Sequence, residues 1–226
     1  MITTWQTIYA TKISEKGGLS SFILNKEKRS AGALINRLRK NLKYGSKILE
    51  VGTGTGAIGA LLIKYGFDVT GIDIDTEMLK IAQKSFALFG KPDNLLNIDA
   101  KNVANIFKEN SFDCVISHGM LEHYSNNDIL LYLNDQLKIS PLVVFVVPMK
   151  AMSANYKSKG FGNERYLSTK IWKKILKDNF YIKNIFGFGI KETNNLFIHD
   201  KIIKINLFAK IFAPFCAFNE FWITQK

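Results

Sequence analysis

The chain has 226 residues, 47% of them hydrophobic, which is enough for one domain with a sizeable buried core. No stretch reaches the ~18 consecutive apolar residues that a membrane-spanning helix needs. The N-terminus lacks the basic and apolar regions of a secretory signal. Two cysteines, Cys114 and Cys216, do not make a disulfide framework, and Cys114 lies in an apolar run typical of a buried thiol. We therefore expect a cytoplasmic protein.

The formal net charge is +12, from 31 lysines and arginines against 19 aspartates and glutamates. Such a surplus can indicate binding to nucleic acid or to an anionic membrane. Here the charge is nearly all lysine, scattered along the chain, without an arginine-rich tract or zinc-finger spacing. The charge therefore does not favour specific nucleic-acid binding, and nucleotide bias in the coding genome also accounts for it.

Helical patterns and short apolar runs alternate along the first two thirds of the chain. Helical spacing predicts helices at Lys26–Tyr44, Gly56–Tyr65, Asp75–Phe89, Val103–Lys108 and Asn127–Leu137. Apolar runs predict strands at Lys47–Val51, Phe67–Asp73, Leu95–Ile98, Phe112–Ser117 and Leu142–Val147. In the first helix, Arg37, Arg39 and Lys40 are expected on the solvated face. Strands separated by one helix each pair in parallel, which predicts a doubly wound α/β sheet with its ligand at the carboxyl ends of the strands.

The last third is less regular. Residues 149–166 read as a long loop, and Thr169–Asp178 as a helix with Ser168 as its N-cap. Phe180–Gly189 and Ala217–Gln225 read as strands, with an amphipathic helical segment, Asn195–Phe212, between them. This order predicts a closing antiparallel hairpin with a helical insertion.

A glycine-rich stretch, "LEVGTGTGAIG" at Leu49–Gly59, follows the first strand and contains G-x-G-x-x-G. Alone, that motif indicates a dinucleotide site. Three acidic residues at successive strand ends favour another ligand. Asp73 is placed for ribose hydroxyls, and Asp99 could accept from an adenine amino group. Glu50 would repel a pyrophosphate but suits a zwitterion that carries a sulfonium.

The motifs "ILEVGTGTG", "VTGIDID", "NIDA" and "FDCVISHGMLEH" together resemble those of class I S-adenosylmethionine-dependent methyltransferases. The ending Leu121–His123 resembles the type-11, small-molecule branch. The resemblance covers residues 47–148 and implies a seven-stranded, mostly parallel sheet, S-adenosylmethionine as cofactor, S-adenosylhomocysteine as product and no metal. It implies cofactor contacts from Glu50, Gly52, Thr53, Gly54, Thr55, Gly56, Asp73, Ile74, Asp99, Ala100 and Ser117. One domain is expected, with a helical cap (1–45), a cofactor core (46–148) and a substrate side (149–226).

Two histidines, His118 and His123, follow the fourth strand and are candidate catalytic bases. Packing of His123 against the next helix stays open, and Glu122 reads as structural. The acceptor side is expected in 8–22, 149–166 and 191–215, with aromatic residues that suit a flat, apolar acceptor. Arg165 suggests an anion contact, unless Glu164 pairs with it.

The predicted function is methyl transfer to an O or N atom of a small-molecule acceptor. Alternatives are a methyltransferase of RNA or protein, a non-catalytic module that binds an adenosyl ligand, and a dehydrogenase, which Glu50 disfavours. The missing Asn/Asp-Pro-Pro-aromatic motif after the fourth strand, where "SHGM" stands, disfavours DNA adenine methylation. Segment 191–215 could be core, an acceptor lid or a membrane-surface contact. The sequence leaves the oligomeric state open.

Overall fold

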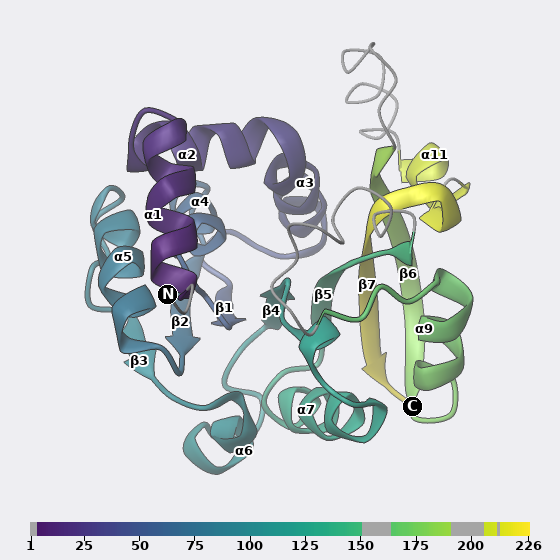
Figure 1. Cartoon of the computed structure of the whole chain (residues 1–226). Helices are drawn as coiled ribbons and strands as arrows, with labels where there is room; N and C mark the ends of the chain where they lie inside the picture. The colour runs from purple at the N-terminus through teal and green to yellow at the C-terminus, as the bar shows by residue number, and fades with distance from the viewer. Residues whose placement is uncertain (1–3, 151–163, 191–205, 212) are drawn as a thin grey trace. The chain divides into compact units, whose positions relative to one another are not determined.

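The computed structural model describes residues 4–150, 164–190, 206–211 and 213–226 (Figure 1). The chain divides into two compact units, Met1–Cys114 and Val115–Lys226. Its seven strands form a sheet with the order β3-β2-β1-β4-β5-β7-β6. The predicted α/β fold with a mostly parallel sheet and an antiparallel C-terminal hairpin is confirmed. The single-domain organisation stays a prediction.

The first unit is built from alternating strands and helices. Its strands are β1 (Lys47–Val51), β2 (Asp68–Asp73) and β3 (Leu95–Asn97), which pair in parallel with β2 in the middle. Its helices are α1 (Trp5–Glu15), α2 (Leu19–Lys26), α3 (Gly32–Asn41), α4 (Ala57–Lys64), α5 (Thr76–Ala87) and α6 (Val103–Ile106). A π-turn, η1 (Glu27–Ala31), joins α2 to α3, and a 3-10 turn, η2 (Ala100–Asn102), precedes α6.

The second unit continues with β4 (Cys114–His118) and β5 (Val143–Pro148), which pair in parallel. The long strands β6 (Phe180–Ile190) and β7 (Cys216–Gln225) form the antiparallel hairpin, and β7 also pairs with β5. The other elements are η3 (Leu121–His123), α7 (Asn126–Ile139), α9 (Thr169–Leu176), α11 (Asn206–Ile211) and η5 (Ala213–Phe215). Ser168 caps α9 as expected, its Oγ accepting from the Ile171 amide at 3.4 Å.

The core follows from the apolar strands. In β5 every side chain from Val143 to Pro148 is buried, as a strand covered on both faces requires. The rings of Phe145, Trp172 and Phe221 pack together with centroids 5.0–5.9 Å apart. The thiols of Cys114 and Cys216 are buried, and burial raises the pKa of Cys216 to about 11. The predicted burial of Cys114 is confirmed.

The N-terminal helices differ from the predicted Lys26–Tyr44 helix. The helical run begins at Leu19, after Gly17 and Gly18 at φ 77° and 101°, and α3 ends at Asn41. The π-turn between α2 and α3 brings the carbonyl oxygen of Glu27 within 2.4 Å of where a Gly32 Cβ would stand, so that position excludes any side chain.

The solvated position predicted for Arg37 is wrong, because this residue is buried at 3% exposure. It lies beside the apolar stripe of α3, within the wide buried face that such helices present.

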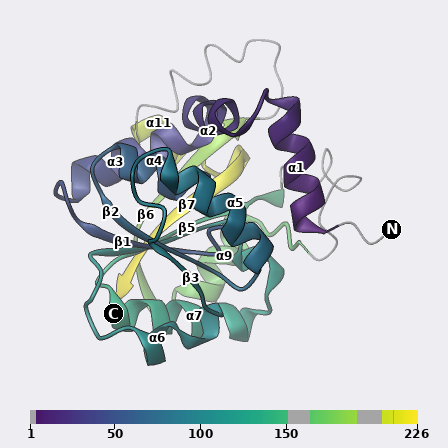
Figure 2. The same cartoon turned by 90° about the vertical axis from the view of Figure 1, so that its left-hand side faces the viewer.

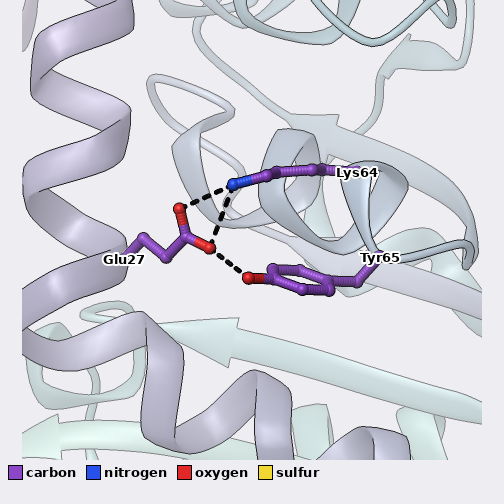
Figure 3. Close-up of polar contacts among 3 residues, drawn as sticks. All are labelled: Glu27, Lys64 and Tyr65. Atoms are coloured by element: carbon purple, nitrogen blue, oxygen red, sulfur yellow. Dashed lines mark hydrogen bonds and ion pairs between the residues drawn. The ribbon is translucent and has the colours of Figure 1, made fainter.

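A clamp built on Glu27 fastens the π-turn to the end of α4. The ammonium of Lys64 lies 2.9 and 3.1 Å from the two Glu27 oxygens, and the Tyr65 hydroxyl donates to the same carboxylate (Figure 3). Burial alone would raise the pKa of Glu27, but the bonds from Tyr65 and Lys64 outweigh it and lower this pKa. Helices α2 and α4 lie side by side in both cartoon views (Figures 1 and 2).

Parts of the expected acceptor side lie outside the described residues. These parts are 151–163 and 191–205, which include Tyr156, Phe161, Phe197 and His199. Within the expected Asn195–Phe212 helix, α11 is the described portion. Across the described ranges, no helix combines the length and the apolar character that a membrane crossing demands.

Candidate active site

A glycine turn leaves β1 and reverses the chain into α4. Gly52, Gly54 and Gly56 adopt φ of 68°, 53° and 68°, in the left-handed region that favours glycine. The turn is fastened by the Thr53 amide, which donates to the Ile72 carbonyl on β2 at 2.9 Å. The alternating glycines are therefore a backbone requirement of this turn.

The glycines of the G-x-G-x-x-G motif have different surroundings. A Cβ on Gly56 would lie 2.8 Å from the Ala82 Cα, and one on Gly59 would lie 2.6 Å from the Phe86 ring, so both permit close helix packing. A Cβ on Gly54 would meet nothing nearer than the Met78 Cε at 3.9 Å. Gly54 is thus the motif glycine at which an added Cβ would make only ordinary van der Waals contacts.

Glu50 lies under the turn and is 3% exposed. Its Oε2 accepts from the Thr53 hydroxyl at 2.6 Å and from the Gly59 amide, in the first turn of α4, at 3.0 Å. Burial raises the pKa of Glu50 to about 7, against the lowering effect of these two bonds. The Glu50 carboxylate thus already accepts from an amide at the N-terminus of α4, and a bound diphosphate would need such amides as donors.

Asp73 ends β2 beside the turn. Its Oδ2 accepts from the Gly54 amide at 2.8 Å, and its Oδ1 accepts from the Asp75 amide at 3.0 Å. Burial is the main cause that raises the pKa of Asp73, and these backbone bonds oppose it. The carboxylate is therefore held in one orientation next to Gly54.

The remaining predicted cofactor residues of the first unit follow β2 and β3 or belong to the glycine turn. Ile74 is 68% exposed, which is unusual for isoleucine and leaves its side chain available to a flat ligand. Asp99 caps η2 by accepting from the Lys101 amide at 3.0 Å, and Ala100 begins that turn. Thr53 and Thr55 are buried.

Ser117, His118 and His123 belong to the second unit. Ser117 is 2% exposed on β4, and within the described part of the chain its hydroxyl has no hydrogen-bond partner. His118 ends β4 with its ring 6.2 Å from that of Phe218, and His123 ends η3; both are half-buried. His118 is therefore the last residue of the fourth strand instead of following it, whereas His123 does follow it, and the catalytic role of both stays a prediction.

Glu122, read as structural from the sequence, is a buried carboxyl group at 3% exposure. Its Oε2 has no hydrogen-bond partner among the described residues, and its main-chain oxygen accepts from the Arg165 amide at 2.9 Å. Burial, with a further contribution from Glu164, raises the pKa of Glu122 to about 8. The structure therefore holds this group as a neutral acid at neutral pH.

We predict that Glu122→Gln stabilises the protein at alkaline pH. The folded pKa of Glu122 lies above its unfolded value, so stability is full below about pH 4.5 and is lost as pH rises towards about 8. Gln does not titrate. The free energy of unfolding of the variant should therefore exceed that of the natural protein by on the order of 3 kcal/mol at pH 8 and by much less at pH 5. Urea unfolding at both pH values measures this, with the exposed Glu109→Gln as control. An equal difference at both pH values would contradict it.

Arg165 is engaged within the second unit. Its guanidinium donates to the Tyr124 carbonyl and, at 2.6 Å, to the Asn126 Oδ1. Glu164 accepts from the Tyr166 hydroxyl instead of pairing with Arg165. Arg165 thus fastens its own segment to the start of α7, which argues against the anion contact that the sequence suggested.

Among the described residues, no group of three or more His, Cys, Asp or Glu side chains is arranged to hold a metal ion. Burial lowers the pKa of Lys26, at the end of α2, and the charge of Glu50 opposes this shift. Lys26 lies outside the motifs, so the sequence gave no sign of this electrostatic interaction.

Residues 48–138 match a family model described as a methyltransferase domain. The matched residues run from β1 into α7 and include the glycine turn, so the part of the chain that holds the turn is similar to a methyltransferase domain.

Part of the chain is similar to curated methyltransferases. A ubiquinone biosynthesis O-methyltransferase from Colwellia psychrerythraea is 38% identical over 84 residues, which are 37% of this chain and 34% of the relative. The chain spans about a third of the length of the curated relatives it matches.

Two solved structures share the fold. A magnesium protoporphyrin IX methyltransferase from Synechocystis with bound SAH has a TM-score of 0.62 at 17% identity, covering 90% of this chain and 85% of that one. A SAM dependent methyltransferase from Aquifex aeolicus has a TM-score of 0.63 at 17% identity, covering 96% and 98%.

Proposed function

We propose that this chain is a methyltransferase that uses S-adenosylmethionine to methylate an O or N atom of a small-molecule acceptor. The observation that carries the proposal is the glycine turn, where Gly54, at which an added Cβ would meet no clash, lies next to the fixed carboxylate of Asp73, with the carboxylate of Glu50 held by the same turn. The exposed Ile74 beside Asp73 suits an adenine ring. These residues fit an adenosyl ligand with a cationic tail.

The same residues disfavour a dinucleotide. A diphosphate binds best where the amide groups at a helix N-terminus meet it unopposed. In this chain the Gly59 amide of α4 donates to Glu50, and the buried carboxylate would repel a second anion. The dehydrogenase alternative therefore lacks the phosphate site it requires.

Each predicted cofactor residue then has a role. Asp73 accepts from the ribose hydroxyls, Ile74 packs on adenine, and Asp99 and Ala100 flank the adenine edge. Glu50 and the turn residues Gly52, Thr53, Gly54, Thr55 and Gly56 surround the amino-acid tail, and Ser117 remains a predicted cofactor residue of the second unit. S-adenosylmethionine supplies a methyl group already activated by a sulfonium.

The chain's task is to align the acceptor and exclude water, since alignment alone can supply roughly 7–11 kcal/mol. An acceptor hydroxyl loses a proton as its oxygen attacks the methyl carbon, and His118 or His123 takes that proton. The product is S-adenosylhomocysteine.

The small-molecule acceptor is favoured by the curated relative from Colwellia, a ubiquinone biosynthesis O-methyltransferase. The alternative acceptors, RNA and protein, are favoured by the net charge of +12. A non-catalytic adenosyl-binding module would keep the turn without turnover.

Production of S-adenosylhomocysteine separates these cases. The purified chain is incubated with S-adenosylmethionine and, separately, with a panel of phenols and amines, with total RNA and with a protein extract. We expect turnover with members of the small-molecule panel. Turnover only with RNA or protein would move the function to a macromolecular acceptor, and binding without any turnover would leave a binding module.

A further inference from the structure

One buried carboxylate of the second unit is not used by the proposed reaction. Glu220 of β7 is 0% exposed, and its Oε1 accepts from the indole Nε1 of Trp222 at 2.5 Å. Burying a carboxylate is costly unless donors and a positive charge face it. The indole N–H offsets part of that cost, and a cation on the same face of the sheet would offset more.

The strand register places a histidine on that face. Val146 of β5 pairs with His118 of β4 on one side and with Glu220 of β7 on the other (Figure 1). Residues paired directly across neighbouring strands point to the same face of a sheet. His118 and Glu220 therefore stand in one cross-strand row, two strand spacings or about 10 Å apart at their Cα atoms.

The ring contacts show that the His118 side chain leans across β5 towards β7. Its ring centroid lies 6.2 Å from that of Phe218, whose ring stacks on Phe188 of β6 at 5.3 Å. Phe218 stands two residues before Glu220 on β7 and so shares its face. The gap between His118 and Glu220 thus narrows towards their side-chain ends, and a buried charge acts strongly over such a distance because little water screens it.

The other groups near this row that could carry a negative charge are held neutral at neutral pH. Glu122 of η3 has its Oε1 3.5 Å from where a Gly119 Cβ would stand, and burial raises its pKa to about 8. Burial likewise raises the pKa of the Cys216 thiol, at the start of β7, to about 11. The side chains of β5 carry no titratable group. Glu220 is therefore the anion expected to act on His118.

One lysine lies over the same row of side chains. The ammonium of Lys210, in α11, is 5.4 Å from the ring centroid of Phe186, and Phe186 pairs with Glu220 across β6 and β7. A cation there favours the ionised form of Glu220. Lys210 is itself exposed, so water screens its repulsion of a second cation at His118.

We propose that the Glu220 carboxylate stabilises the protonated imidazole of His118, so that His118, and not His123, is the base of the proposed reaction. The acceptor hydroxyl gives its proton to the His118 ring while its oxygen forms a bond to the methyl carbon. The carbon–sulfur bond breaks, and its electron pair stays on sulfur. Glu220 acts through His118 and is a positioning residue. The inference rests on the proposed function, because the proton it describes is released in that reaction.

NMR titration of the histidine rings in the full chain tests this coupling without cofactor or acceptor. The chain has three histidines, and the signal of each ring is assigned by its loss when that histidine is replaced by glutamine. In the natural chain, the titration midpoint of His118 should lie above the ordinary value of about 6.5. Glu220→Gln should lower this midpoint by about one pH unit or more, which is about tenfold weaker proton binding, and the fall should be confined to His118.

The matched control is Asp178→Asn, which removes an exposed carboxylate of the same unit and should leave the His118 midpoint in place. Glu220→Gln keeps the shape of the side chain and an oxygen for the Trp222 indole, and circular dichroism checks that it folds. If it does not fold, the midpoint of His118 in the natural chain decides alone.

A His118 midpoint at or below about 6.5 in the natural chain, or no fall in Glu220→Gln, overturns the inference while the proposed function stands. With an acceptor that yields S-adenosylhomocysteine, His118→Ala should lower kcat about a hundredfold or more, and His123→Ala should lower it much less. The reverse order would overturn the choice of base. Failure of the natural chain to turn over any acceptor overturns the proposed function and the choice of base with it, whereas the coupling of Glu220 to His118 is judged by the titration.

Discussion

A Gly54→Val variant should fold and lose affinity for S-adenosylhomocysteine by more than about a hundredfold. An added Cβ at Gly54 meets no protein atom closer than 3.9 Å, so the valine side chain would enter space that we assign to the ligand. The residue has φ of 53°, so valine adds strain of roughly 1–3 kcal/mol. That strain is smaller than the usual stability of a domain.

The neighbouring glycines provide the contrast. Gly59→Ala would place its Cβ 2.6 Å from both the Glu50 Oε2 and the Phe86 ring, so it should damage folding itself. Thermal melting by circular dichroism and calorimetric titration of both variants separate the two effects. A folded Gly54→Val variant with normal affinity would show that the glycine turn is not the ligand site.

Asp73→Ala should weaken S-adenosylhomocysteine by about tenfold to a hundredfold, since a hydrogen bond to a charged group contributes roughly 1.5–3 kcal/mol. The carboxylate is held by the amides of Gly54 and Asp75, so it is oriented before the ligand arrives. We expect it to accept from both ribose hydroxyls, and alanine removes both acceptors.

Asp75→Ala is the matched control. Asp75 caps α5 by accepting from the Glu77 and Met78 amides at 2.9 and 3.2 Å. Its loss should cost about 1 kcal/mol of stability and leave the affinity nearly unchanged. If the two variants weaken binding equally, the effect comes from a loss of local structure, and a direct contact between Asp73 and the ligand would be excluded.

The parts of the fold that could be predicted are those that local sequence determines. The strands β1 and β5 are short apolar runs between turn residues, and glycines mark the ends of α4 and α5. The glycine turn was found for the same reason, because alternating glycines reflect backbone dihedrals that other residues rarely adopt. Even there, the sequence could not separate Gly54, where an added Cβ would fit, from Gly56 and Gly59, where it would clash with a packed helix.

The parts that could not be predicted depend on contacts between distant residues. The sequence predicted a single helix from Lys26, whereas the helical run begins at Leu19 and passes through the π-turn Glu27–Ala31 between α2 and α3. The burial of Arg37 follows from how α3 packs, which no local pattern records. The buried acid Glu122 was likewise assigned no chemistry, since its environment comes partly from Glu164, far along the chain.

Calorimetric titration of the full chain with S-adenosylhomocysteine and with NAD tests the central claim most directly. The claim is that Glu50 and Asp73, arranged around the glycine turn, select a zwitterionic adenosyl ligand over a diphosphate. We predict saturable one-site binding of S-adenosylhomocysteine and no measurable binding of NAD at the same concentrations. Comparable affinity for NAD, or no binding of S-adenosylhomocysteine, would contradict it.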